Sequence, residues 1–103
     1  MRTLLALLLT TGAASAFDLP IQAGITYCAD AIEVDSSGVY GPDHQCLPVG
    51  AAAPDGSVQL ACQNAEEAYG PDWQMTAIIV EDRAAGTLTY SDDDGPLVMS
   101  RCD

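Results

Sequence analysis

The amino-acid sequence predicts a mainly β domain: a small antiparallel sheet or partly closed barrel of five to six strands, with two disulfides and at most one short helix. Three observations lead to this fold class. Apolar and β-branched residues recur in short runs, and clusters of Gly, Pro, Asp and Ser separate these runs. Only one short segment has a helical composition. Four cysteines lie in a chain of 103 residues, which is typical of a small exported domain held together by disulfides.

Residues 1–16 are predicted to be a secretory signal peptide. Arg2 supplies the charged start, an apolar run spans Leu4–Leu9, and the small residues A-S-A end the segment. The apolar run is too short for a membrane anchor, which needs about 20 apolar residues. Cleavage after this segment leaves a single domain, residues 17–103, in the bacterial periplasm or outside the cell.

The first half of this domain contains three strand-like segments. Ile25–Val34 alternates between apolar and polar residues, but the phase shifts near Asp30, which predicts a β-bulge or a break at that point. The D-S-S-G sequence at Asp35–Gly38 is typical of a turn. His44–Val49 and Val58–Cys62 are expected to be short strands, with a Pro-Asp-Gly turn before the second.

The second half begins with the one candidate helix, the segment Gln63–Gly70. Asn64 is the expected cap of this helix, which is at most two turns long. An antiparallel three-stranded meander is expected over Trp73–Cys102, because strand-like runs alternate there with short, turn-like connections. We expect Trp73 to lie in the core; an exposed Trp at this position would instead indicate a recognition surface.

A six-residue motif occurs twice, as YGPDHQ at Tyr40–Gln45 and as YGPDWQ at Tyr69–Gln74. The sequences around the two copies do not align, so a duplicated structural unit is not indicated. Pro and Asp are typical of turns, and a strand-like run follows each copy. We interpret the motif as a turn that introduces a strand, with Tyr40 and Tyr69 at the edge of the core. The alternative is a paired ligand site made of the two tyrosines and the two aspartates.

The four cysteines are expected to form two disulfides. No C-x-x-C pair is present, which disfavours a zinc site. Four cysteines allow three connectivities. Cys46 and Cys62 flank a loop between neighbouring expected strands, which favours a bond between them. Cys28 would then pair with Cys102 and join the two ends of the domain.

The domain is strongly acidic. All fifteen Asp and Glu residues lie after the predicted signal peptide, against only Arg83 and Arg101 and no Lys, so its net charge is −13. Nucleic-acid binding needs a basic surface, which this composition lacks, and an anionic membrane surface would repel the domain. We expect no membrane insertion once the signal peptide is removed. A basic protein partner or a metal ion would be attracted, although such a charge also serves solubility alone.

The sequence contains no recognisable catalytic constellation. His44 is the only histidine, and the nearby Cys46 is expected to be oxidised, which removes the thiolate that a Cys–His pair requires. No G-x-S-x-G motif is present. We therefore expect a protein that is not an enzyme and has no cofactor. The candidates for a metal site are the adjacent Asp92, Asp93 and Asp94, which could bind calcium, but the spacing of an EF-hand loop is not present.

The order of the cysteines, one early, a pair in the middle and a final R-C, resembles small exported four-cysteine bacterial β-domains of unassigned function. The chain also resembles, more faintly, the periplasmic inhibitors of c-type lysozyme, which are small disulfide-containing β-barrels. That family inserts an S-G-x-x-Y loop into the lysozyme cleft. Ser37, Gly38 and Tyr40 form S-G-x-Y here, one residue shorter, and the family's T-K-G element has no counterpart because the chain has no Lys. The resemblance implies a partner-binding loop at these three residues.

Three functions follow from these observations. The first is an exported, non-enzymatic domain that binds a partner or has a structural role in the cell envelope. The second is a periplasmic inhibitor of c-type lysozyme, which predicts an exposed, rigid loop over Ser36–Tyr40. The third is a calcium-binding module, which predicts that Asp92–Asp94 converge with a second acidic loop.

Overall fold

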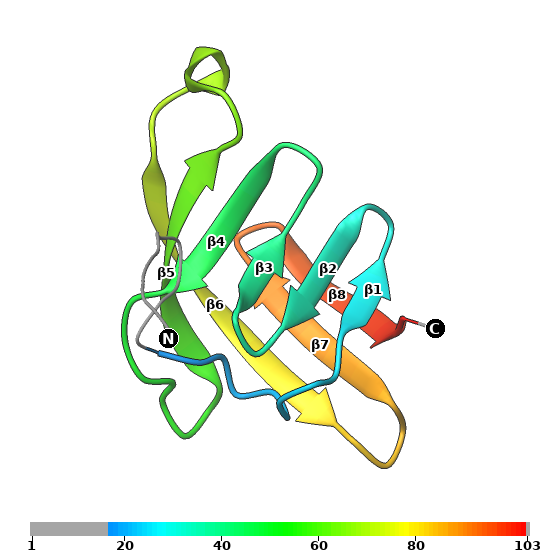
Figure 1. Cartoon of the computed structure of the whole chain (residues 1–103). Helices are drawn as coiled ribbons and strands as arrows, with labels where there is room; N and C mark the ends of the chain where they lie inside the picture. Colours follow the sequence, from blue (N-terminus) through cyan, green and yellow to red (C-terminus); the bar gives the residue numbers. More distant parts are fainter. Residues whose placement is uncertain (1–16, 103) are drawn as a thin grey trace, which may run out of the picture.

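The computed structural model describes residues 17–102, and the predicted signal peptide lies outside them. The chain forms a closed antiparallel barrel of eight strands, in which each strand pairs with the next and the last pairs with the first (Figure 1). The elements are β1 (Tyr27–Ala29), β2 (Ile32–Asp35), β3 (Gly38–Tyr40), β4 (His44–Pro48), β5 (Ser57–Asn64), the 3-10 turn η1 (Glu67–Tyr69), β6 (Trp73–Asp82), β7 (Thr87–Asp92) and β8 (Gly95–Arg101).

The prediction of mainly β structure is confirmed, but the prediction of five to six strands is wrong, because the barrel has eight and is closed. The segment Ile25–Val34 forms two strands, since a two-residue loop at Asp30 and Ala31 turns the chain back on itself. Asp30 has a φ of 53°, a left-handed conformation that suits tight hairpin loops. The other missed strand is β3, whose three residues are too few to show a periodicity.

Closure of the barrel depends on a contact between the two ends of the domain. β1 lies antiparallel to β8, with Cys28 opposite Ser100, and no hairpin joins these strands. The Cys28–Cys102 disulfide joins them instead, with Cα atoms 5.2 Å apart. The second disulfide links Cys46 of β4 to Cys62, the residue directly opposite on β5. This is the pairing that the expected strand order favoured, and two disulfides are consistent with an oxidising compartment outside the cytoplasm.

Inward-facing apolar side chains from all eight strands fill the barrel. In β5, Val58, Leu60 and Cys62 are buried and Gln59 between them is exposed, which is the alternation expected of a strand with one face in a core. The segment before β1 also contributes to the core. Its Leu19 is buried, and the Leu19 N–H donates to the carbonyl oxygen of Ser36 at 2.8 Å, so this segment covers one end of the barrel. The buried apolar residues are Leu19, Ile21, Tyr27, Val34, Val39, Cys46, Val58, Leu60, Cys62, Ala77, Ile79, Leu88, Tyr90 and Met99.

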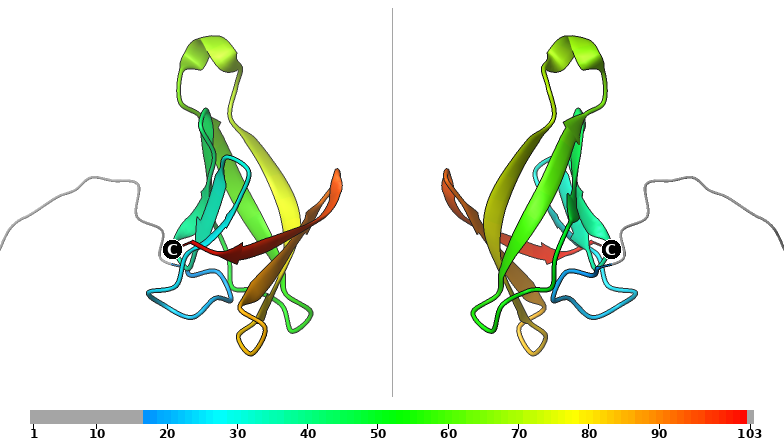
Figure 2. Two further views of the ribbon diagram at one scale, coloured as in Figure 1. Left: turned by 90° about the vertical axis from the view of Figure 1, so that its right-hand side faces the viewer. Right: turned by 90° about the vertical axis from the view of Figure 1, so that its left-hand side faces the viewer.

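The antiparallel order sends alternate connections to opposite ends of the barrel. The β1–β2, β3–β4, β5–β6 and β7–β8 connections leave one end, which we call the arm end. The other connections and the segment 17–26 lie at the opposite end, which we call the closed end. The β5–β6 connection, residues 65–72, is called the arm. It contains η1 and projects beyond the rest of the barrel in both views of Figure 2.

The expected helix is reduced to a single 3-10 turn within the arm. Asn64 does not cap it, because Asn64 is the last residue of β5 and its Nδ2 donates to the carbonyl oxygen of Gly70 at 3.2 Å. This bond ties the beginning of the arm to its end. No helix within residues 17–102 has the length and apolar character needed to cross a membrane.

Candidate functional site

The two copies of the YGPD motif lie on either side of β5. β4 begins at His44, the residue after the first copy, and β6 begins at Trp73, the residue after the second. In the first copy, the Gly41 N–H donates to the carbonyl oxygen of His44 at 2.9 Å and closes a tight turn. Each copy therefore introduces a strand, as the turn interpretation expected. Because β4 and β6 are both neighbours of β5, the two turns also meet at the arm end.

Contacts between the two copies bring them together in part. The rings of His44 and Trp73, which follow the two YGPD segments, lie with their centroids 6.0 Å apart and tilted by 45°. The Ala65 N–H of the arm donates to the carbonyl oxygen of Asp43 at 2.7 Å, so the first copy lies beside the arm that contains the second. A hydrogen bond to Glu66 and the nearby charge of Asp43 raise the pKa of Tyr69. Tyr40 is not part of this contact. Tyr40 lies on the outer face of the barrel, and the β3–β4 register pairs it with Gln45.

Two aromatic side chains at the arm end are more exposed than the sequence predicted. Tyr69 is 56% exposed and Trp73 is 37% exposed, so the predictions that Tyr69 packs at the edge of the core and that Trp73 lies within it are wrong. The reason is topological. Trp73 is opposite Cys62 near the end of β5, where the β5–β6 hairpin passes beyond the closed part of the barrel. The Trp73 side chain therefore points toward the inside of the sheet, but at this height no core surrounds it and it contacts solvent.

Charge is distributed unevenly between the two ends of the barrel. The arm end carries a set of carboxylates in its four connections, and the arm itself includes Glu66 and Asp72. Within residues 17–102 the only basic side chains are Arg83 and Arg101, and both lie at the closed end, in the β6–β7 connection and at the end of β8. The exposed aromatic residues therefore stand in a negative field that no basic side chain in the described part of the chain offsets nearby.

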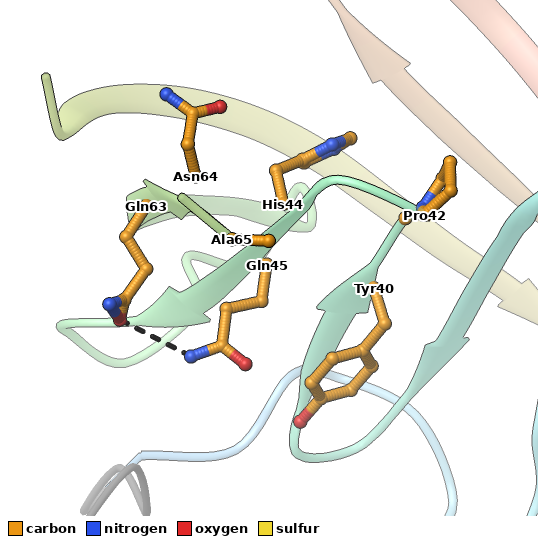
Figure 3. A pocket seen from close by; sticks show the side chains of 8 residues that line it. Tyr40, Pro42, His44, Gln45, Gln63, Asn64 and Ala65 are labelled. Atoms are coloured by element: carbon orange, nitrogen blue, oxygen red, sulfur yellow. Dashed lines mark hydrogen bonds between the residues drawn. The ribbon is translucent and has the colours of Figure 1, made fainter. Parts of the chain in front are cut away.

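A shallow hollow of about 380 Å³ lies beside the first YGPD copy (Figure 3). Gln45 and Gln63 are opposite each other on β4 and β5, and the Gln45 Nε2 donates to the Gln63 Oε1 at 3.2 Å. Figure 3 shows Gln45 and Tyr40 extending to one side of the ribbon, whereas His44 and Asn64 extend to the other. The residues that line the hollow are Tyr40, Gly41, Pro42, His44, Gln45, Gln63, Asn64 and Ala65.

Of the three residues of the sequence-predicted partner loop, Ser37 lies in the β2–β3 turn at the closed end, and Gly38 and Tyr40 are the first and last residues of β3. The Oδ1 of Asp35 accepts hydrogen bonds from the backbone N–H of Ser37 at 2.8 Å and from its hydroxyl, and this hydroxyl lies 2.6 Å from the Tyr40 Oη. Gly38 is buried, and a Cβ at this position would lie 2.7 Å from the carbonyl oxygen of Cys46. Ser37 itself is exposed, so the turn is both accessible and tightly held.

The residues considered for metal binding and catalysis do not assemble into such a site. Asp92, Asp93 and Asp94 form the β7–β8 turn, in which the Asp92 Oδ1 accepts the Asp94 N–H at 2.8 Å. Within residues 17–102, no group of three or more His, Cys, Asp or Glu side chains is placed to hold a metal ion. His44 lies beside Trp73, and the thiol of Cys46 is committed to a disulfide.

A largely covered carboxylate at the closed end was missed by the sequence analysis. The Glu81 side chain is only 5% exposed, and it accepts hydrogen bonds from the Tyr27 Oη at 2.8 Å and the Gln22 N–H at 3.1 Å. The exposed Arg83 adds a contact of 3.2 Å between its Nε and the Glu81 Oε1. Burial raises the pKa of Glu81, but these hydrogen bonds outweigh it and hold the pKa below its usual value. The position of Glu81 two residues after the inward-facing Ile79 was the signal that could have revealed it.

Comparisons with models of protein families, with curated proteins and with solved structures find no match for this chain.

Proposed function

We propose that this protein is a non-enzymatic exported domain that binds a basic protein partner through its arm end. One observation carries the proposal: Tyr69 on the projecting acidic arm and Trp73, the first residue of β6 directly after the arm, are 56% and 37% exposed. Exposed aromatic residues are the commonest anchors of protein interfaces, because each buries a large area with little loss of conformational freedom. The surrounding negative field selects a partner of the opposite charge.

The charge asymmetry gives the proposed interaction a direction. A basic partner is attracted to the arm end and encounters the two arginines only at the opposite end. Such steering accelerates association and weakens as salt is added, since the Debye length falls from about 10 Å at 0.1 M salt to about 3 Å at 1 M. The two aromatic side chains then supply the apolar contact, which salt does not weaken.

Site-specific photo-crosslinking in the cells that export the protein tests this proposal. A photoreactive phenylalanine analogue in place of Tyr69 is expected to form an adduct with a basic protein, and the yield should fall as salt is raised. The matched control is the same analogue in place of Val98, which is 64% exposed but lies on the wall of β8. Equal adducts from both positions, or none from position 69, would overturn the proposal.

A second candidate, inhibition of a c-type lysozyme, is favoured by the geometry of the β2–β3 turn. Ser37 is exposed, and the turn is held because the Asp35 carboxylate accepts hydrogen bonds from Ser37 and the Ser37 hydroxyl shares a hydrogen bond with the Tyr40 hydroxyl, as a rigid inserting loop requires. The test is the activity of a c-type lysozyme with the oxidised protein at low and high salt. Stoichiometric inhibition that is lost in Ser37→Ala would support this candidate. An unaffected lysozyme at a large molar excess of the protein, at low salt, would eliminate it.

A further inference from the structure

The hollow beside the first YGPD copy differs chemically from the arm. The protein is strongly acidic, yet none of the residues that line this hollow is Asp, Glu, Lys or Arg. On one side of the ribbon the lining offers the side-chain amides of Gln45 and Gln63 and the phenol ring of Tyr40, whereas His44 and Asn64 extend to the other side. A site of this composition suits an uncharged ligand that both donates and accepts hydrogen bonds.

The pair formed by Gln45 and Gln63 gives the hollow a defined hydrogen-bonding pattern. One N–H of Gln45 is used in the bond to the Gln63 Oε1. In the described part of the chain, the Oε1 of Gln45 and the Nε2 of Gln63 have no protein partner. The pair therefore presents one acceptor and one donor side by side, held in place by the strand register and by the bond between the two amides.

Tyr40 forms an aromatic wall next to this amide pair. It lies beside Gln45 (Figure 3), which is its partner in the register of β3 and β4. Its hydroxyl lies 2.6 Å from the Ser37 hydroxyl and is held by that hydrogen bond. The phenol ring is therefore restrained at its far end as well as at the backbone. A restrained ring beside fixed polar groups reduces the entropy that a ligand loses on binding.

We propose that this hollow binds a neutral saccharide. Two adjacent hydroxyls of a sugar ring match the amide pair, because one hydroxyl can donate to the Gln45 Oε1 while its neighbour accepts from the Gln63 Nε2. The C–H face of the ring can then pack against Tyr40. Anionic sugars are disfavoured, because Glu33 lies opposite Tyr40 on β2 and the whole domain carries a strong negative charge.

Nuclear magnetic resonance titration of the oxidised, ¹⁵N-labelled exported protein tests the proposal, since side-chain amide groups give their own signals. The probes are three neutral trisaccharides: β-1,4-linked N-acetylglucosamine, β-1,4-linked glucose and α-1,4-linked glucose. Each is added to roughly 10 mM, above a dissociation constant on the order of 1 mM that a few exposed hydrogen bonds and one ring contact support. At least one probe is expected to shift the side-chain signals of Gln45 and Gln63.

Two variants separate a specific site from a general effect. Gln63→Ala is expected to weaken binding about tenfold, because the hydrogen-bond donor is removed. Gln59→Ala is the matched control: Gln59 lies on the same outer face of β5 and bonds to the Thr76 hydroxyl at 2.9 Å, but it does not line the hollow. It should leave binding unchanged.

Failure of all three probes to move the Gln45 and Gln63 signals would overturn the proposal, and so would equal losses of binding in the two glutamine variants. The saccharide test does not depend on whether the arm end binds a protein partner. Tyr69→Ser removes an arm residue that does not line the hollow, so saccharide binding should survive in that variant even if the arm end has no partner.

Discussion

Removal of the Glu81 carboxylate is expected to destabilise the closed end of the barrel. The Tyr27 side chain is fully buried, and its hydroxyl donates to the Glu81 Oε2 at 2.8 Å. In Glu81→Ala the hydroxyl is left buried without this acceptor, which costs about 1–3 kcal/mol. Arg101 also acts on this hydroxyl, but its guanidinium has only donors and cannot replace the lost acceptor. We expect Glu81→Ala to lower the free energy of unfolding by about 2 kcal/mol.

A double-mutant cycle measured by urea denaturation of the oxidised proteins isolates the contribution of the hydrogen bond. Tyr27→Phe removes the hydroxyl, so the subsequent loss of the carboxylate no longer orphans a buried donor. The cycle of Tyr27→Phe and Glu81→Ala should therefore give a coupling energy of about 1–2 kcal/mol. The reasoning is refuted if the two substitutions are additive, or if Glu81→Ala changes the free energy of unfolding by less than about 0.5 kcal/mol.

The same carboxylate predicts the pH dependence of this difference. Because the folded protein holds the pKa of Glu81 below its ordinary value of 4.5, the ionised form stabilises the fold. This stabilisation is fully present above pH 4.5 and is lost as the pH falls through the lower pKa of the folded state. The advantage of the native protein over Glu81→Gln should therefore be largest near neutral pH and should shrink in acid. A difference that grew in acid would contradict the assignment.

Three further predictions concern the covalent and local constraints. The Cys46–Cys62 disulfide closes a loop of 16 residues, so its loss should lower the free energy of unfolding by about 3 kcal/mol. The Cys28–Cys102 disulfide closes a loop of 74 residues, so its loss should cost about 4.5 kcal/mol. Chemical denaturation of the paired Cys→Ala variants measures both losses. Gly38→Ala should cost about 1–3 kcal/mol because its Cβ would meet backbone at 2.7 Å, whereas Gly50→Ala, with nothing within 4 Å, should leave the unfolding midpoint almost unchanged. Millimolar calcium should not raise the melting temperature, because the acidic β7–β8 turn uses a carboxylate internally; a clear increase would reinstate the calcium hypothesis.

Local patterns were sufficient to predict much of the secondary structure. The alternation in Val58–Cys62 and the β-branched run that begins at Trp73 each reflect a strand with one buried face, and the structure places β5 and β6 there. The phase shift near Asp30 was detected but interpreted as a bulge or a break within one strand. A turn of two residues produces the same shift, so the periodicity alone could not separate the alternatives.

Exposure at the arm end could not be read from the same patterns. Trp73 has the inward phase of β6, which predicts burial, yet its position beyond the closed part of the barrel leaves it 37% exposed. Glu81 has the same phase at the opposite end, where its side chain is only 5% exposed and accepts hydrogen bonds from Gln22 and Tyr27. Trp73 and Glu81 both occupy inward-facing positions of β6, yet one side chain is exposed and the other is covered. The difference arises because β6 extends beyond the barrel core at the arm end but not at the closed end.

The sequence by itself determined that this chain is a strand-rich, acidic domain with four cysteines, because composition and short-range periodicity require no knowledge of distant contacts. Tertiary structure decided that the sheet closes, since the pairing of Cys28 with Ser100 joins strands from opposite ends of the domain. It also decided which turns meet, placing His44 beside Trp73 and Gln45 beside Gln63. Those contacts are set by which strands become neighbours in a closed barrel, a property of the whole chain that no short segment encodes.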